Sequence, residues 1–333
     1  MAKTRHGIRS ARARAKQDAR VRAYRDHDPA KVKAAIEQDL HIHRIRKFPS
    51  DFLAIQRSGA LLISLPEYGK ILLPLDHLPA DTIPAGMPPH LAIRYEHFLS
   101  ADHQRRLQRR WDDVRASDAG QHLKCDTNRS NADGYHFGIW EVTGKMPRLT
   151  AETHKQSAKA QEAINALLFY VQTFIAPKIG TAFEEHAPNH WAAMLKAHAR
   201  VQKCLRRRIL ERPITDMGGP FFALAVKESG SGLIHIDWND NRAIYAYIFA
   251  VGDWEGGEFC IPQLGIKIPV RPGQVLAVLA RVVAHFSAPV TTGRRIVRRG
   301  NLQSVSARFP VHENQPAICR PAARSYVVGA HAA

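Results

Sequence analysis

Six short apolar segments follow one another closely in the second half of the chain, separated by turn sequences rich in glycine and proline. Segments of this length between such turns are typical of β-strands. Helical sequence precedes them, and helices followed by closely spaced strands favour an α+β fold in which a β-sandwich or jelly roll is flanked by helices. The six segments are residues 221–226, 233–237, 244–251, 258–261, 266–270 and 275–283.

Two helical stretches are predicted upstream of these strands. The first opens near Pro147 and Thr150 and is expected to end at Pro177, and the second ends at Pro213. Apolar residues recur at spacings of three and four in both, which predicts one buried face on each helix. The expected buried positions are Ile164, Leu167, Leu168, Val171, Phe174 and Ile175 in the first helix, and Trp191, Met194, Leu195, His198, Val201 and Leu205 in the second.

The chain of 333 residues divides into five parts on these patterns. We expect a flexible basic arm (1–47), an accessory N-terminal region (48–150), a helical support (151–213), a β-rich core (214–310) and an irregular tail (311–333). The last strand of the core is expected to be poor. Two arginines and a glycine at positions 298–300 interrupt its alternation, which predicts an incompletely closed barrel.

The charge balance is strongly basic, with 48 Lys and Arg against 30 Asp and Glu, a net charge of +18 and a pI of about 10.1. Half of this excess lies in the first fifty residues, so the rest of the chain is basic as well. We expect nucleic acid as a partner, although the arm alone could be a solubilising tail. The sequence contains no apolar run of membrane-spanning length and no apolar signal segment, which predicts an intracellular protein, nuclear or nucleocytoplasmic, that is neither secreted nor in a membrane.

A possible metal site lies in the second of the six segments. His235 and Asp237 are two residues apart, so on a strand their side chains face the same way. This pattern arises by chance about once in a chain with 18 histidines, so a third ligand is needed. His285, just after the segment 275–283, can complete a set of two imidazoles and one carboxylate. Such a set suits non-haem Fe(II), because it leaves positions open for a cosubstrate and dioxygen; zinc is the alternative.

A basic residue downstream suggests the cosubstrate. Pro289 and Gly293 predict a hairpin that returns Arg295 beside the segment carrying His285. A guanidinium holds a carboxylate through two parallel hydrogen bonds and stays charged at neutral pH. We therefore expect Arg295 to bind the far carboxylate of 2-oxoglutarate, whose keto-acid end would bind the iron.

The order of these motifs resembles that of a known family. The sequences HIDWND, GDWEGGEFCIPQLG, RPGQVLAV and AHFSAPVTTGRR, spread over roughly residues 221–297, are similar to the double-stranded β-helix of the Fe(II)- and 2-oxoglutarate-dependent dioxygenases. Within that superfamily they are most similar to the TET/JBP-like group, which is expanded in fungi and often linked to transposons.

The resemblance implies a fold, ligands and cofactors. Residues 214–310 would form a double-stranded β-helix that binds Fe(II), 2-oxoglutarate and dioxygen. Iron would be held by His235, Asp237 and His285, and the cosubstrate carboxylate by Arg295, with Arg294 as the alternative.

The resemblance also implies a substrate class. Characterised members of the group oxidise the methyl group of 5-methylcytosine or thymine in DNA, whereas neighbouring groups hydroxylate prolyl side chains or repair alkylated bases. The basic charge favours nucleic acid, DNA before RNA, and a target base would be flipped into the barrel. Trp238, Asn239 and Asp240 are then expected to contact it, unless Trp238 only plugs the barrel mouth. The alternatives are a protein hydroxylase of the prolyl type and a degenerate nucleic-acid-binding remnant.

Overall fold

The computed structural model describes residues 62–78, 83, 86–117, 134–140, 147–154, 156–228, 234–237 and 240–301. The predicted basic arm (1–47) and irregular tail (311–333) lie outside the described residues. So do Trp238 and Asn239.

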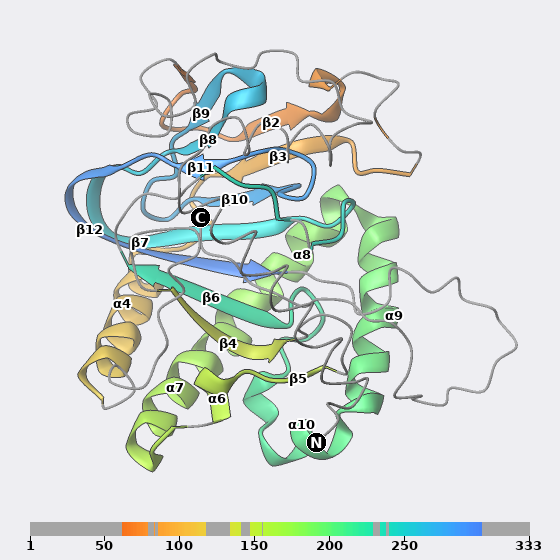
Figure 1. Cartoon of the computed structure of the whole chain (residues 1–333), viewed down its shortest axis with the longest axis vertical. Coiled ribbons are helices and arrows are strands. Elements are labelled where there is room, and N and C mark those ends of the chain that lie inside the picture. The colour runs from red at the N-terminus through yellow and green to blue at the C-terminus, as the bar shows by residue number, and fades with distance from the viewer. Residues whose placement is uncertain are drawn as a thin grey trace, which may run out of the picture.

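A large sheet, whose spatial strand order differs from the order of the strands in the chain, runs through the middle of the molecule (Figure 1). Its neighbouring strands are antiparallel throughout. Four of its strands come from the segment 48–150 that we expected to be an accessory region, so part of that segment belongs to the same sheet as the predicted core. In spatial order the strands are β2 (Ile71–Pro74), β3 (His90–Tyr95), β10 (Val275–Val278), β7 (Ala246–Gly256), β12 (Val290–Asn301), β6 (Ala223–Glu228), β4 (Gly134–Trp140) and β5 (Arg148–Leu149).

A smaller sheet lies at the top in Figure 1. Its strands, in spatial order, are β1 (Ile63–Ser64), β9 (Ile266–Ile268), β8 (Phe259–Ile261) and β11 (Phe286–Ser287). From β6 onward the chain repeatedly crosses between the two sheets, with β7, β10 and β12 in the large sheet and β8, β9 and β11 in the small one. This alternation is the topology of a jelly roll. The predicted α+β class with a jelly-roll core flanked by helices is therefore confirmed.

The helices pack on one face of the large sheet. Phe183 contacts the rings of Tyr245 and Tyr247 near and within β7, and Trp111 contacts Tyr135 and Phe137 of β4. Two helices begin at serine caps, which satisfy a backbone N–H of the first turn: Ser100 before α4 and Ser157 before α7. The helices are α4 (Ala101–Ala116), α6 (Ala151–His154), α7 (Ala158–Tyr170), α8 (Ala176–His186), α9 (Pro188–Cys204) and α10 (Arg206–Glu211).

The first long helix does not end at Pro177, so that prediction is wrong. A π turn, Val171–Ile175, joins α7 directly to α8. Such a turn breaks the regular i→i−4 ladder just where Pro177 has no N–H to donate, so the helix continues past it. The π turn also shifts the apolar stripe by part of a turn, and Phe174, expected to be buried, is 42% exposed.

The joined helix is also the one described segment that is long and apolar enough to cross a membrane, judged by length and composition alone. It spans Ala158–His186, and 56% of its most apolar window is buried inside the structure. Buried core helices meet the same criterion, and this helix packs against α4 and, through Phe183, against β7.

The final strand is better formed than the sequence suggested. Strand β12 pairs with β7 on one side and with β6 on the other, up to Gly300 and Asn301 respectively. The prediction of a poor final strand and an open barrel edge is therefore wrong. Pairing on both sides supplies backbone hydrogen bonds that do not depend on the alternation of side chains, so the interrupted pattern at residues 298–300 does not break the strand. Gly293 lies within this strand rather than in a turn; only the residues around Pro289 form the connection.

Candidate metal centre

Two of the three predicted metal ligands are joined by their own backbone. His235 donates its N–H to the carbonyl of His285 over 3.0 Å and accepts the N–H of His285 over 2.8 Å. The following Asp237 donates its N–H to the carbonyl of Ala280 over 3.2 Å. These bonds place the predicted HxD segment beside the end of the apolar segment that carries His285. The two pieces of the motif, about fifty residues apart, therefore meet at one point.

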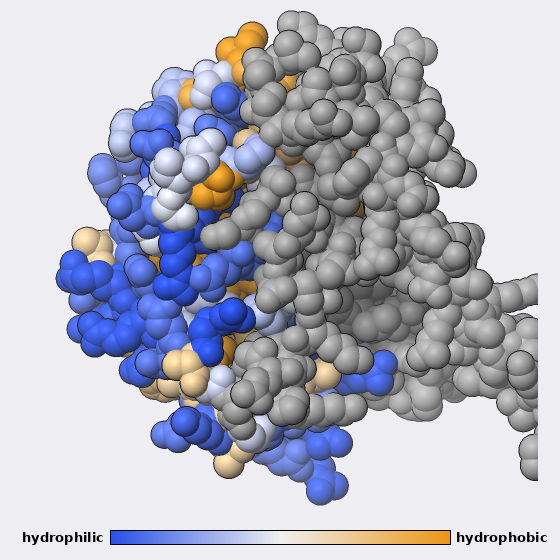
Figure 2. Space-filling view, turned by 60° about the vertical axis from the view of Figure 1, so that its left-hand side comes forward, coloured by the Kyte–Doolittle hydropathy of each residue, from blue (hydrophilic) through white to orange (hydrophobic). Residues whose placement is uncertain are grey.

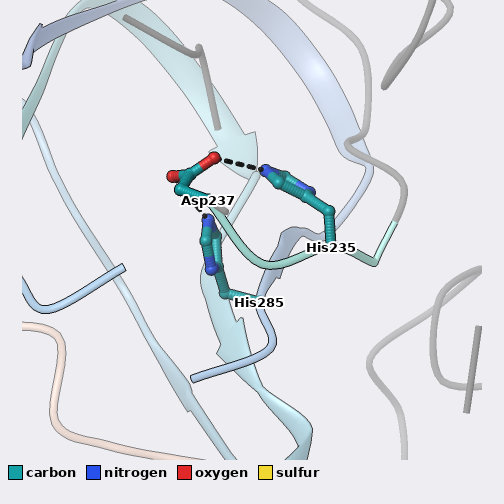
Figure 3. A group of neighbouring side chains, drawn as sticks. All are labelled: His235, Asp237 and His285. Atoms are coloured by element: carbon teal, nitrogen blue, oxygen red, sulfur yellow. Dashed lines mark ion pairs between the residues drawn. The ribbon is translucent and has the colours of Figure 1, made fainter. Parts of the chain in front are cut away.

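The three side chains converge (Figure 3). Their candidate ligand atoms all lie within 4.8 Å of one another. The carboxylate lies between the rings: Asp237 Oδ1 is 3.7 Å from His235 Nε2, and Oδ2 is 3.5 Å from His285 Nε2. All three residues are at most 1% exposed. The structure thus brings together the set of two imidazoles and one carboxylate that the sequence predicts.

The ring of His285 is held in one orientation. Its Nδ1 lies 3.1 Å from the carbonyl oxygen of Val283, so Nδ1–H donates to that oxygen and the lone pair is left on Nε2. Phe259 stacks on the other side of the ring at 5.0 Å between centroids and an interplanar angle of 21°. His285 Nε2 is buried and has no hydrogen-bond partner in the described structure. A buried nitrogen of this kind is poised to bind a cation.

Arg295, the predicted cosubstrate ligand, is buried in the barrel. It is 1% exposed, and within the described part of the chain its Nε and Nη1 atoms have no hydrogen-bond partner. Burial lowers its pKa to about 10, against the opposing effects of Glu258 and Cys260, so the guanidinium remains protonated at neutral pH. A buried charge without a hydrogen-bonded partner is costly, and a bound carboxylate would relieve that cost.

Arg294, the alternative ligand, is held elsewhere. It forms ion pairs with Glu228 of β6 and, over 2.7 Å, with Asp112 of α4. Glu228 also accepts a hydrogen bond of 2.9 Å from the indole of Trp111. Burial tends to raise the pKa of Glu228, but these bonds outweigh it, so the pKa is lowered and the carboxylate stays ionised. Arg294 therefore fastens α4 to the sheet, and the structure does not bring it to the metal ligands.

Residues around Arg295 that the sequence did not single out complete its surroundings. Trp254 lies 5.8 Å from the guanidinium, measured to the ring centroid, and its buried indole nitrogen has no hydrogen-bond partner among the described residues. The same holds for the hydroxyl of Ser287, two residues after His285. A Cβ added to Gly257 would lie 3.0 Å from Arg295 Cδ and 3.1 Å from its Nη1. Gly257 thus leaves room for the guanidinium.

Two further basic side chains are buried on the same face of the large sheet. Lys227 pairs in register with Val297, two residues from Arg295, and is 2% exposed. His136 of β4 pairs with Ala225, two residues from Lys227, and is 8% exposed. Positions two apart on a strand share a face, so both project to the side of the sheet that carries Arg295. The available sequence signal was a lysine directly after the apolar segment 221–226.

The predicted substrate-contact residues are only partly described. Trp238 and Asn239 lie outside the described residues. Asp240 is 8% exposed, and its backbone N–H donates to the carbonyl of Asp237 over 2.9 Å.

Comparison with known proteins gives matches to solved structures alone. No family model and no curated protein matches the chain. It is similar to NgTET1 in complex with 5mC DNA, at 14% identity over 64% of this chain and 72% of that one, with a TM-score of 0.46. It is also similar to a prolyl-4-hydroxylase from Pseudomonas putida, at 15% identity over 64% and 92% (TM-score 0.33), and to an oxidoreductase of the 2OG-Fe(II) oxygenase family from Burkholderia pseudomallei, at 12% identity over 64% and 87% (TM-score 0.37). Because these scores are low, the function proposed below rests on the geometry of the site itself.

Proposed function

We propose that this protein is an Fe(II)- and 2-oxoglutarate-dependent dioxygenase that oxidises a methylated base in nucleic acid. The observation that carries the proposal is one combination: a buried cluster of His235, Asp237 and His285, and a buried arginine in the same barrel whose Nε and Nη1 lack hydrogen-bond partners within the described residues. Neither half alone would specify the chemistry. The three ligand side chains without the arginine would fit a zinc site. A buried arginine without these side chains would fit any anion.

The donor set fits iron. Two neutral imidazole nitrogens and one carboxylate oxygen fill one side of a metal and leave the other coordination positions open, which is the preference of non-haem Fe(II) sites. When bound, iron would supply the dioxygen chemistry, coupled to the oxidative decarboxylation of 2-oxoglutarate to succinate and carbon dioxide. The role of the protein is to hold the ligands: His285 is oriented by its Nδ1–H bond to Val283, and Asp237 by its backbone bond to Ala280.

The surroundings of Arg295 fit a dicarboxylate. Its guanidinium can pair with the carboxylate far from the metal, and the hydroxyl of Ser287 and the indole N–H of Trp254 are further buried donors near the same strands. Each of these donors is costly to bury without a partner, and a carboxylate bound at Arg295 would accept hydrogen bonds from the guanidinium. Arg295 is 1% exposed, so it is shielded from solvent, which strengthens the pairing.

The substrate is proposed from charge. A net charge of +18, half of it outside the first fifty residues, favours a polyanion over a neutral peptide. A base oxidised inside a barrel has to leave the duplex, and DNA is proposed before RNA because of the motif resemblance. A nuclear or nucleocytoplasmic location stays a prediction. A prolyl-type hydroxylase and an inactive nucleic-acid-binding protein are the outcomes against which the substrate is tested.

Two measurements test the proposal in sequence. Under anaerobic conditions, Fe(II) plus 2-oxoglutarate should give a metal-to-ligand absorption band and raise the melting temperature, and neither should occur in Asp237→Ala. Incubation in air with 5-methylcytosine-containing DNA should then give an oxidised base by mass spectrometry together with succinate. No band in the wild type would reject the oxygenase, whereas a band and succinate without base oxidation would reject only the substrate.

A further inference from the structure

Phe259 comes from the middle of the small sheet. Its strand, β8, pairs with β11 on one side and with β9 on the other, and the residues opposite Phe259 are Ser287 and Ile268. Opposite residues of antiparallel strands project to the same face, and so do residues two apart on one strand. Phe259 therefore shares a face with Ser287 and with His285, which lies two residues before it. Because backbone hydrogen bonds hold β8 on both sides, the ring of Phe259 has a fixed support.

The ring of Phe259 lies nearly parallel to the imidazole of His285. Their centroids are 5.0 Å apart and the interplanar angle is 21°. Among the described residues, the one other ring in contact with His285 is that of His235, its fellow ligand, at 4.4 Å and 53°. A flat ring stacked in this way restricts the plane of the imidazole, which an aliphatic side chain of similar volume does not. The orientation of Phe259 therefore matters as much as the volume that it fills.

The imidazole of His285 also makes one hydrogen bond within the described part of the chain. Its Nδ1–H donates to the carbonyl of Val283 over 3.1 Å, whereas Nε2 has no partner there. A single hydrogen bond leaves the ring free to rock, since the directions accepted at a carbonyl oxygen are broad. The stack on Phe259 removes that freedom. Together the two contacts direct Nε2 towards Asp237, whose Oδ2 lies 3.5 Å away (Figure 3).

We propose that Phe259 is a positioning residue for the metal centre: by stacking on His285, it holds the lone pair of Nε2 in the direction of Asp237 before a cation arrives. A ligand that is already oriented loses less conformational freedom on binding, so the affinity for the metal rises. Phe259 acts through His285 and not by contact with the metal. This inference rests on the proposed function, because it assigns a role towards the metal that His235, Asp237 and His285 would hold.

The test compares variants of the full chain that differ at one buried ring. Phe259→Leu keeps an apolar side chain but removes the ring, whereas Phe259→Tyr keeps the ring. The matched control is Phe249→Leu. Phe249 is also buried, but it lies on β7 two residues from Tyr247, on the face that packs against α8 through Phe183.

These substitutions leave the outside of the molecule as it is. Phe259 is 1% exposed and Phe249 is 0% exposed. The described surface that comes forward in Figure 2, on the side of α4, is largely hydrophilic. Differences between the variants therefore report on the interior and not on a changed surface.

The first measurement is the affinity for Mn(II) alone, by isothermal titration without 2-oxoglutarate. Phe259→Leu should bind Mn(II) roughly tenfold more weakly, as is usual when a residue that orients a metal ligand is replaced. Phe259→Tyr should bind more tightly than Phe259→Leu, because the ring is retained. Phe249→Leu should bind like the wild type, although urea denaturation should show a loss of stability comparable to that of Phe259→Leu.

The second measurement needs no metal. At about pH 8, where an ordinary histidine is neutral, NMR of the chain labelled at its histidine nitrogens should show His285 in a single form, protonated at Nδ1. The resonance is assigned by its absence from His285→Gln. In Phe259→Leu it should be broadened or averaged between the two tautomers, and in Phe249→Leu it should be unchanged. Loss of packing alone would not produce this difference between two buried rings.

Three results would overturn the inference. These are wild-type affinity for Mn(II) in Phe259→Leu, an equal loss of affinity in Phe249→Leu, or an unchanged His285 resonance in Phe259→Leu. If the wild type binds no Mn(II), the proposed metal centre is rejected, and the NMR comparison still decides whether Phe259 orients His285. Should Phe259→Leu fail to fold, Phe259→Met takes its place with the same expected results.

Discussion

Arg294 and Arg295 are neighbours on β12 whose side chains meet opposite sides of the large sheet. Arg294 pairs with Glu228 and with Asp112 of α4, on the helical side, whereas Arg295 lies beside Trp254 and Gly257 in the barrel. Successive side chains on a strand point to opposite faces, so these two arginines have different surroundings and different roles. Arg294 holds α4 in place, and Arg295 is the side chain that we propose binds the cosubstrate carboxylate.

This relationship gives the first prediction. Arg295→Ala should weaken 2-oxoglutarate binding by roughly ten- to a hundredfold, because a charge-assisted hydrogen bond contributes about 1.5–3 kcal/mol. Arg294→Ala should leave 2-oxoglutarate affinity nearly unchanged but lower the free energy of unfolding, since Glu228 loses a partner. Isothermal titration with Mn(II) or Fe(II) present and urea denaturation measure the two effects. Equal cosubstrate affinity in both variants would remove the role assigned to Arg295.

A second prediction concerns the space left by Gly257. A methyl group at this position would lie 3.0 Å from Arg295 Cδ, and the residue has a φ of 69°. Gly257→Ala should therefore cost backbone strain of about 1–2 kcal/mol and also weaken 2-oxoglutarate binding. Gly86→Ala is the matched control, because Gly86 has a φ of 77° but nothing within 4 Å of the added methyl group. The control should lose stability alone, and a similar loss of cosubstrate affinity in it would contradict the packing argument.

A third prediction concerns the carboxylate between the two imidazoles. Asp237→Asn keeps the shape of the side chain but removes the negative charge that a divalent cation needs. Its affinity for Fe(II) or Mn(II) should fall by at least about 100-fold, measured by anaerobic titration. Asp253→Asn removes an exposed carboxylate from the same sheet and should bind metal like the wild type. Normal metal affinity in Asp237→Asn would show that the three side chains do not form the metal site.

A fourth prediction concerns acid stability at the base of α9. Burial would raise the pKa of Asp216, but hydrogen bonds from His198, Gln202 and the N–H of Gly218 outweigh it and lower the pKa to about 2. An ordinary aspartate in an unfolded chain has a pKa of about 3.9, so this carboxylate stabilises the fold above about pH 4 and the contribution disappears as the pH falls towards about 2.

His198→Ala removes one of those hydrogen bonds and should raise the pKa of Asp216. The variant should be less stable than the wild type at about pH 5, and the difference should shrink by about pH 2.5. Urea denaturation at the two pH values measures it, with the exposed His77→Ala as control. A stability difference that is the same at both pH values would mean that His198 acts by packing alone.

The sequence predicted the parts of the site that depend on local spacing. The HxD pattern places His235 and Asp237 on one side of an extended segment, and His285 follows an apolar strand, so their convergence could be anticipated. The choice between Arg294 and Arg295 could not be made from the sequence, because it depends on which face of β12 meets the helices. That face is decided by Glu228 and Asp112, which lie 66 or more residues away along the chain.

The failed predictions share a physical cause. The sequence 298–300 lowers the intrinsic strand preference of β12, but pairing with β6 and β7 on both sides overrides it. Pro177 normally ends a helix, but the π turn before it removes the conflict. In the first case strand pairing between distant segments outweighs the low strand preference of the local sequence. In the second case a rare local geometry outweighs the tendency of proline to end a helix.

The place of β12 in the large sheet has a consequence for biosynthesis. This strand is inserted between β6 and β7, which precede it in the chain and leave the ribosome earlier. Until it emerges, the nascent chain exposes the two inner edges of an unfinished sheet, and the arginine proposed to receive the cosubstrate is absent. Folding of the sheet therefore completes only after β12 has emerged, and a nascent chain released before Val290 would carry all three metal ligands on a scaffold with unpaired edges, a natural target for chaperones.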